Sequence, residues 1–312
     1  MSTRTLTPAG PRLARAGRAR PHRKGRPRLA PWVFVAPFLA IFAVFTLLPL
    51  VSSFAMSFTD FRSTDVQDPL GVDFVGLQKY EAVFTNGAFL KSMLNTGYFV
   101  AVGIPLTIVV ALALAVALNN GISRFRTIYR VGFYVPVVTS IVAISTGWRF
   151  ILQPDGPLNA ALRLVGIQGP DWLNSMVWAM PALIVMATWR NAGTLMVIFL
   201  AGLQAVPQEL QEAAMVDGAG AWRRFWSITL PILRPTMLLG SVLLSVGFLQ
   251  FFEEAFVMTR GGPLNSTLSI TYFTYNQFGF GQYGLASAAS YILFIVIALV
   301  SLIQFRLLRS QD

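Results

Sequence analysis

The segment EAAMVDGAGAWRRFWSITLP, residues 212–231, decides the fold of this chain. It is polar and helix-forming, yet it lies between two long apolar segments. Pro207 can open a short helix at its first position, Glu209 suits the first turn, and Gly218 can end the helix as a C-terminal cap. A simple membrane anchor would not need such an interruption, so we expect a docking loop over residues 207–235.

The second half of this loop is rich in aromatic residues. Residues 221–229 can form another short helix, with Trp222, Phe225 and Trp226 at positions i, i+3 and i+4 of one face. Pro231 and Pro235 are expected to stop that helix. The three rings either pack against the chain's own helices or form a partner site, and an exposed apolar patch of this kind favours a partner.

The composition requires a membrane protein. Of 312 residues, 55% are hydrophobic and only 12% are charged, which is more apolar surface than a soluble globule of this size can bury. A membrane-spanning helix needs about 20 apolar residues. We therefore predict an all-α integral membrane protein over residues 31–312, with six transmembrane helices near residues 32–54, 97–118, 131–151, 173–203, 236–257 and 283–304.

The fourth predicted span is ambiguous because Arg190 lies near its middle. Too few apolar residues separate Arg190 from Gln204 for a second crossing of the membrane. One tilted or broken helix, loosened at Gly193, is the more economical interpretation.

The distribution of Lys and Arg predicts the orientation. The first 30 residues carry nine basic residues and no acid. The loops on the same side of the membrane add Arg124, Arg126, Arg130, Arg223, Arg224, Arg234, Arg306 and Arg309. Because basic loops face the cytoplasm, we place both termini and the loop 207–235 in the cytosol.

Residues 1–30 form a basic tail rich in Pro, Gly and Arg, which we expect to be disordered. The apolar run that follows is far longer than the core of a cleaved signal peptide, so it is predicted to be an uncleaved first span. The net charge of +11 would suit nucleic acid, but such tails more often serve topology and contact anionic lipid. We therefore predict membrane lipid as a partner, and no nucleic acid.

Cysteine is absent and the single histidine, His22, lies in the tail. This composition excludes thiol catalysis, disulfides, Cys/His metal sites and a histidine-dependent triad. A P-loop needs Gly-x4-Gly-Lys-Ser/Thr, and the one lysine that precedes serine, Lys91, follows Leu90 rather than glycine. We predict no catalytic site, no metal site and no P-loop in this chain.

The docking loop resembles the EAA loop of binding-protein-dependent ABC importer permeases, because residues 212–231 match E-A-A-x3-G-x9-I-x-L-P in full. The segments Ala201-Gly202-Leu203-Gln204 and Gly261-Gly262-Pro263 resemble the sugar-type branch, which includes maltose-type and glycerol-phosphate permeases. The likeness runs from about Trp32 to Arg306. The sequence departs from the family in its basic tail and at Glu253-Glu254, where an aromatic-acid pair is common.

The resemblance implies a set of partners. These are a second permease subunit in a heterodimer, two copies of a cytosolic ABC ATPase that binds ATP and Mg, and an extracytoplasmic solute-binding protein; no cofactor is expected in this chain. It also implies a bacterial or archaeal cytoplasmic membrane and alternating access, in which closure of the ATPase moves the loop. The residues expected to couple the two are Glu212, Ala213, Ala214, Gly218, Trp222, Phe225 and Pro231. Glu212 is expected to be a polar anchor toward the ATPase groove or the loop's own backbone, the alanines permit close approach, and the glycine allows the turn.

Ionisable groups inside spans are costly and should face protein or water. Arg190, Glu253 and Glu254 are such groups, and with Asn191 and Gln250 they make up the predicted path of a carbohydrate, polyol or sugar-phosphate solute. Arg190 is either a structural ion-pair partner or a member of that path. The alternative function is an ion-coupled secondary transporter that uses Arg190 and Glu253-Glu254 as a relay, which leaves the docking loop unexplained.

Overall fold

The computed structural model describes residues 30–68, 71–120 and 126–309, and these residues are helical apart from loops and one isolated antiparallel bridge between Thr59 and Phe74. The predicted basic tail therefore lies outside the described residues, except for Ala30. The chain divides after Pro49 into two units, which we describe separately.

The first unit contains helix α1 (Ala30–Phe42) and a π-helical turn (Ala43–Leu47), and helix α2 (Leu48–Met56) follows. Together they give an apolar helix from Trp32 to Met56, long enough to cross a membrane. The amide of Leu48 donates to the carbonyl of Ala43, an i to i−5 bond that places the π turn directly before Pro49.

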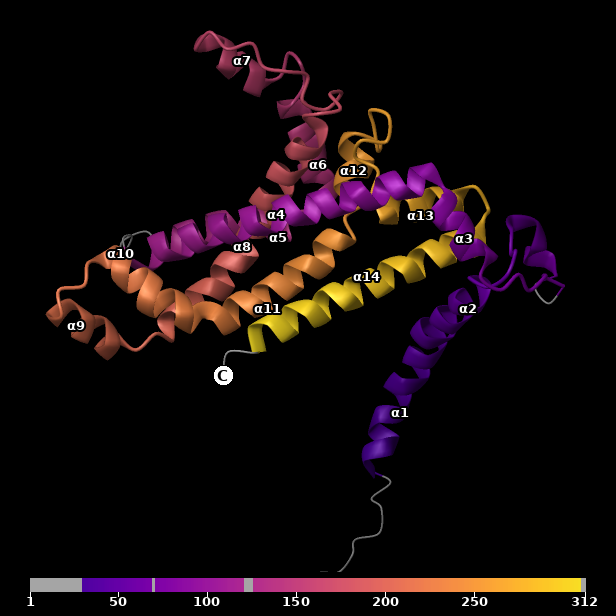
Figure 1. The fold of residues 1–312 in the computed structure, drawn as a ribbon, viewed down its shortest axis with the longest axis horizontal. Helices are drawn as coiled ribbons and strands as arrows, with labels where there is room; N and C mark the ends of the chain where they lie inside the picture. Colours follow the sequence, from indigo (N-terminus) through magenta and orange to yellow (C-terminus); the bar gives the residue numbers. More distant parts are fainter. Residues whose placement is uncertain (1–29, 69–70, 121–125, 310–312) are drawn as a thin grey trace, which may run out of the picture. The chain divides into compact units, whose positions relative to one another are not determined.

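In the second unit, four long helices lie side by side: α4 (Gly87–Asn120), α8 (Ala179–Gln204), α11 (Leu230–Leu249) and α14 (Tyr283–Arg309) (Figure 1). Helix α8 is the most buried of the candidate spans and contacts both α4 and α11. Apolar residues on nearly all its sides explain this central position, because a helix that is hydrophobic all round belongs in the middle of a bundle.

Polar side chains tie these helices together inside the bundle. The hydroxyl oxygens of Thr107 on α4 and Thr188 on α8 are 3.1 Å apart and hydrogen-bonded. Gln304 on α14 donates its side-chain N–H to the Ser245 hydroxyl on α11 over 2.6 Å. Such bonds between small side chains hold apolar helices together where lipid supplies no hydrophobic drive.

The third predicted span is a bent pair of helices rather than one helix over residues 131–151. Helix α5 (Arg126–Val138) and helix α6 (Ile141–Ile151) meet at an angle of 99°. Pro136 lacks the N–H of an intact helix, and the Thr139 hydroxyl donates to the Val135 carbonyl over 2.8 Å. The described residues thus hold five helices able to span a membrane, or six when this pair counts as one.

The fourth span begins at Ala179, not at residue 173, and it is unbroken at Gly193. Side-chain hydrogen bonds hold residues 171–178 in turns ahead of the helix. The carboxylate of Asp171 accepts from Asn174, and the Ser175 hydroxyl accepts from the amides of Val177 and Trp178. Gly193 serves close approach instead of flexibility, because a Cβ there would lie 2.1 Å from the carbonyl oxygen of Phe133 on α5.

The fifth span runs farther toward its N-terminus than predicted and ends earlier. Helix α10 (Ala221–Arg224), a π turn (Phe225–Thr229) and α11 form one run from Ala221 to Leu249, so neither Pro231 nor Pro235 stops it. In the π turn the amide of Leu230 donates to the carbonyl of Phe225, five residues back. This wider turn lets the helix continue through Pro231, which has no N–H of its own to donate. The run ends at Gln250, and Glu253 and Glu254 begin a separate helix, α12 (Glu253–Met258), because acids favour a first turn.

Shorter helices complete the second unit: α3 (Gln78–Thr85), α7 (Pro157–Leu164), α9 (Gln208–Val216), α13 (Ile270–Gly279) and a 3-10 turn (Ser63–Gln67). Helices α9 and α10 lie at one end of the long bundle, and α3 and α13 lie near the other (Figure 1). The two ends are therefore available for different interactions.

Candidate functional site

Helix α9 carries the docking-loop motif on a short helix with no buried residue. Pro207 is its N-cap, with φ −61° and ψ 129°. The helix therefore begins at Gln208, one residue later than predicted. Glu209 lies in the first turn, as the dipole of the helix favours. An amphipathic helix that only packed against its own protein would bury one face. Because α9 buries no residue, its surface is open to contact with another molecule.

The C-terminal end of α9 is closed by a Schellman motif around Gly218. Gly218 adopts φ +77°, and its amide donates to the Met215 carbonyl over 3.0 Å. The amide of Ala219 reaches back to the Ala214 carbonyl over 2.8 Å. These two bonds are the signature of this cap, and the predicted role of Gly218 as the turn residue agrees with its geometry.

Two faces of α9 differ in what they meet. Gln208, Gln211, Glu212 and Met215 line a groove; Glu212 accepts from the Gln208 side chain over 3.0 Å, and Gln211 donates to the Thr229 hydroxyl over 3.0 Å. The opposite, exposed face carries Leu210, Ala213 and Val216. Glu212 therefore points to the chain's own groove, while Ala213 is presented outward.

The aromatic residues after the turn form one cluster. The ring centroids of Trp222 lie 6.3 Å from Phe225 and 5.6 Å from Trp226, and Phe225 and Trp226 are 5.7 Å apart. Trp222 is 74% exposed despite these contacts. The cluster, which we call the ring cluster, therefore packs on itself and still leaves a large apolar surface open. Ala214, on the flank of α9, is half-buried.

The groove between α9, the ring cluster, α4 and the end of α8 has a volume of about 1290 Å³. Ile108, Leu112 and Val116 of α4 form its apolar wall, and Glu212 and Arg224 bring charge to it. The Nε atom of Arg224 is buried without a hydrogen-bond partner among the described residues. This groove thus separates α9 and the ring cluster from α4 and the end of α8.

The predicted solute-path residues only partly come together. Glu254 is 6% exposed, and the charge of Arg190 on α8 acts on it. The Nε of Arg190 and the Oε2 of Glu254 are both buried and have no hydrogen-bond partner among the described residues. A buried polar atom without a partner is costly, so each of these two residues carries such a cost.

The other predicted path residues lie differently. Asn191 donates to the Ala187 carbonyl of its own helix over 2.8 Å, which uses its amide locally. Gln250 and Glu253 are exposed at the end of α11 and the start of α12. Trp189 meets Trp148 edge to face, with centroids 5.8 Å apart. Among the described residues, no three His, Cys, Asp or Glu side chains gather closely enough to hold a metal ion.

Comparison with known proteins adds the family to this geometry. Residues 27–311 match the family of the binding-protein-dependent transport system inner membrane component. The chain belongs to this family. It is therefore a multi-pass permease component of the cytoplasmic membrane and not an enzyme, as the resemblance of residues 212–231 implied.

The relatives of the permease are named as transport proteins. The lactose transport system permease LacF of Rhizobium radiobacter is 34% identical over 286 residues, covering 90% of this chain and 94% of the relative. AraP of Bacillus subtilis, an arabinooligosaccharides transport permease, is 34% identical over 284 residues, 90% and 88% of the two chains. MalF of Thermococcus litoralis, a trehalose/maltose transport permease, is 30% identical over 281 residues, 90% and 94%.

A solved structure confirms the all-helical permease fold. A bacterial ABC transporter for import of the polysaccharide alginate matches with a TM-score of 0.75 at 23% identity, covering 91% of this chain and 96% of that one. The ion-coupled alternative receives no support from these relatives.

Sequence reasoning missed residues at both ends of the bundle. Leu210 and Val216 complete the exposed face of α9, and their spacing of three around Ala213 was the available signal. At the other end, Lys91 and Asn95 on α4 and Ser266 line a small polar pocket. Lys91 was noticed only as a failed P-loop lysine, because nothing local in the sequence links it to residue 266.

Proposed function

We propose that this permease forms the translocation path of an ATP-driven importer for a carbohydrate or a related polyol or sugar-phosphate solute, working by alternating access. The names of its relatives support the solute class, since they cover lactose, arabino-oligosaccharides and trehalose or maltose. Three such solutes at similar identity support the class and leave the individual solute open.

The exposure of α9 is the observation that supports coupling of this chain to an ATPase. Its exposed face of Leu210, Ala213 and Val216 offers a small apolar surface without bulky side chains at its centre. A helix of this kind fits a groove on a partner. The partner is a separate ATPase subunit, two copies per importer, which binds ATP and Mg; this chain holds no cofactor.

The connections of α9 suit it to transmit movement. Residues 205–207 join it to α8, and the Gly218 turn joins it to the continuous helical run that ends in α11. Displacement of α9 by the closing ATPase therefore acts on two spans together. In this proposal Ala213 makes the contact, the exposed ring of Trp222, which packs on Phe225, adds to it, and Glu212, Ala214 and Pro231 position α9.

The remaining partners follow the same proposal. Both termini and α9 face the cytosol, a second and different permease subunit completes the pore, and an extracytoplasmic solute-binding protein delivers the solute. A periplasmic binding protein is present in a solved complex of the alginate transporter. Arg190 and Glu254 border the solute path, with Asn191 beside Arg190 and with Gln250 and Glu253 near the outer end of the path.

The proposal is tested by affinity purification of the chain from its native membrane in mild detergent. Recovery of a P-loop ATPase, a second permease and vanadate-sensitive ATPase activity is the expected result. Recovery of this chain alone, without ATPase activity, would contradict the importer.

The coupling step has its own test in Ala213→Asp. Because it places a charge at the centre of an apolar contact, we expect assembly of the spans to persist while uptake and solute-stimulated ATPase activity are lost. Leu164→Asp is the matched control, since Leu164 is 89% exposed on α7 and lies far along the chain from α9. Normal transport by the Ala213 variant would show that α9 does not carry the coupling.

A further inference from the structure

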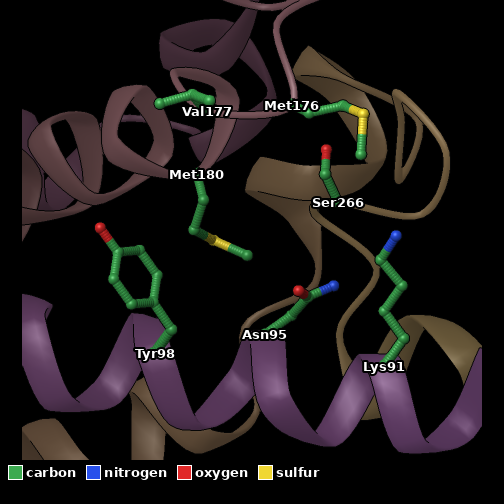
Figure 2. A pocket seen from close by; sticks show the side chains of 7 residues that line it. All are labelled: Lys91, Asn95, Tyr98, Met176, Val177, Met180 and Ser266. Atoms are coloured by element: carbon green, nitrogen blue, oxygen red, sulfur yellow. The ribbon is translucent and has the colours of Figure 1, made fainter.

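A small pocket lies at the opposite end of the bundle from α9, between α4, the start of α8 and the loop before α13. Its volume is about 270 Å³. Lys91, Asn95 and Tyr98 point from α4 toward Met180 and Ser266 across the space (Figure 2). Ligand pockets for larger molecules occupy about 300–1,000 Å³, so this one has room for a single small unit.

The hydroxyl of Ser266 is the first sign that the pocket takes a ligand. Ser266 is only 8% exposed, and its Oγ is buried without a hydrogen-bond partner among the described residues. Buried hydroxyls are nearly always hydrogen-bonded. Ser266 also lines the pocket, so a rotation of its short side chain brings the unpaired hydroxyl to a group that enters the pocket.

The ammonium of Lys91 is the second sign. It donates to the Leu264 carbonyl over 2.6 Å, and a lysine has three donors. Ion pairs of the described residues involve Arg62, Lys79 and Arg163 but not Lys91. Two donors and a full positive charge therefore remain for an anionic group.

Asn95 supplies the complementary acceptor. Its Nδ2 donates to the carbonyls of Asn265 and Leu268, over 2.7 and 2.9 Å. This fixes the amide, and its oxygen lies on the side of Tyr98 (Figure 2). An acceptor beside a cationic donor matches a molecule that carries a hydroxyl next to a carboxylate, and Tyr98 and Met180 offer apolar walls to a sugar ring.

We propose that this pocket is a binding site for a sugar acid: one hexuronate unit whose carboxylate accepts from Lys91 and Ser266 while a neighbouring hydroxyl donates to Asn95. The site deepens the proposed importer function, on which it rests, by adding an acidic sugar to the solute class. Neither Arg190 nor Glu254 lines this pocket.

The absence of cysteine from the chain gives a direct assay. Met176→Cys places a single thiol on the pocket wall at an exposed position, and its rate of maleimide labelling is measured in the intact importer in lipid nanodiscs. Glucuronate is expected to slow labelling, and glucose at equal concentration is not. Leu164→Cys serves as the control thiol, whose labelling should not respond to either sugar.

Two further substitutions test the assigned contacts. In the Met176→Cys background, Lys91→Met should raise the glucuronate concentration for half-protection about tenfold or more, because a charge-assisted bond is lost. Ser266→Ala should raise it about fivefold, without a loss of thermal stability, because the hydroxyl has no protein partner to lose. A serine with a purely structural role would leave the protection unchanged.

Equal protection by glucose and glucuronate would overturn the acidic class, and no protection by glucuronate would overturn the site. Protection by solute-free binding protein alone, lost in Lys91→Met, would assign the pocket to an acidic side chain of that protein and also overturn the proposal. Vanadate-sensitive ATPase activity in the same nanodiscs distinguishes failure of the proposed site from failure of the proposed importer function. Nanodiscs that hydrolyse ATP but show no protection by glucuronate would refute the site without contradicting the importer function.

Discussion

The amide of Ala219 donates to the carbonyl of Ala214 over 2.8 Å, and this bond turns the chain sharply at the end of α9. The bond exists only because Gly218 between them adopts φ +77°, a conformation that side chains with a Cβ disfavour. The exposed face of α9 and the ring cluster are thereby held at a fixed relation to each other.

Replacing Gly218 should weaken this relation. A Cβ at Gly218 would touch nothing within 4 Å, so Gly218→Ala introduces backbone strain and no clash, at about 1 kcal/mol. We expect lower solute-stimulated ATPase activity and uptake with unchanged assembly. Gly220→Ala is the matched control, because Gly220 is equally open but has φ −65°; equal effects of both changes would argue against the cap.

Both π turns in the described part of the chain are followed, one residue later, by a proline. One ends at Leu47 and is followed by Leu48 and Pro49; the other ends at Thr229 and is followed by Leu230 and Pro231. In each, the last amide before proline donates five residues back. The wider turn lets the helix accept a proline that would otherwise clash with the preceding turn.

Removal of Pro231 should therefore change register more than stability. Pro231→Ala restores a backbone donor, so the π turn can relax to α-helix and rotate the ring cluster relative to α11. We expect unchanged or higher thermal stability and reduced coupling of ATP hydrolysis to uptake. Pro235→Ala lies inside α11 away from the π turn and should keep coupling; a coupling loss in that variant alone would reverse the assignment.

The sequence predicted most of the fold where the physics is local. Composition and the length of the apolar segments identified the spans, and Gly218 was recognised as a cap because its role depends on its own backbone. The break after Val138 and the early end at Gln250 were not predicted. Pro136 and the pair Glu253-Glu254 lie beside these positions, but residue type alone does not decide whether a helix bends, ends or continues there. Pro231 and Pro235 show the same ambiguity, because each was expected to stop a helix that in fact runs through it.

The candidate site was predictable to a similar extent. The motif located α9, but only the structure separates Glu212, which lines the groove, from Ala213 on the exposed face. Arg190 and Glu254 were identified by their cost in a membrane, which is a property of residue type. The pocket of Lys91 and Ser266 joins positions far apart in the chain, and sequence spacing carries no signal for such a meeting.

Gly193 is predicted to be required for packing of α5 on α8. A Cβ would lie 2.1 Å from the Phe133 carbonyl oxygen, and backbone cannot move aside as a side chain can. Gly193→Ala should destabilise the purified complex by about 1–3 kcal/mol, measured as a lower thermal midpoint in detergent. Gly147→Ala on α6 meets nothing within 4 Å and should be neutral or slightly stabilising, so a similar drop there would contradict the packing role.

The loop after α2 should respond to acid. The hydrogen bond from Lys79, with help from Arg62, lowers the pKa of Asp60 below its ordinary value. A lowered pKa in the folded state gives stability that is present above the unfolded pKa and is lost as pH falls through the lowered folded value. Hydrogen exchange around Asp60, corrected for intrinsic rates, should therefore lose protection in strong acid.

Lys79→Met tests the cause of this response. It should reduce protection of the Thr59–Phe74 bridge at neutral pH and flatten its acid dependence. Lys91→Met, which removes a lysine without an acidic partner in the described chain, is the control and should leave the response intact. An acid response that persists unchanged in Lys79→Met would mean that another group titrates there.

Arg190 and Glu254 should prove energetically coupled. Each carries a buried atom without a hydrogen-bond partner among the described residues. Burial is the main influence on Glu254 and the charge of Arg190 a smaller one. Because the two charges are opposite, removing one takes away part of what offsets the other. We expect Arg190→Met and Glu254→Gln to lower stability by about 1–3 kcal/mol each, and the double variant to lose less than their sum. Exposed Glu253→Gln is the control and should be nearly neutral. Additive losses in thermal unfolding would mean that the two groups act independently. Uptake kinetics give a second readout: a higher KM in both single variants, with an unchanged KM in Glu253→Gln, would mean that the pair also borders the solute path.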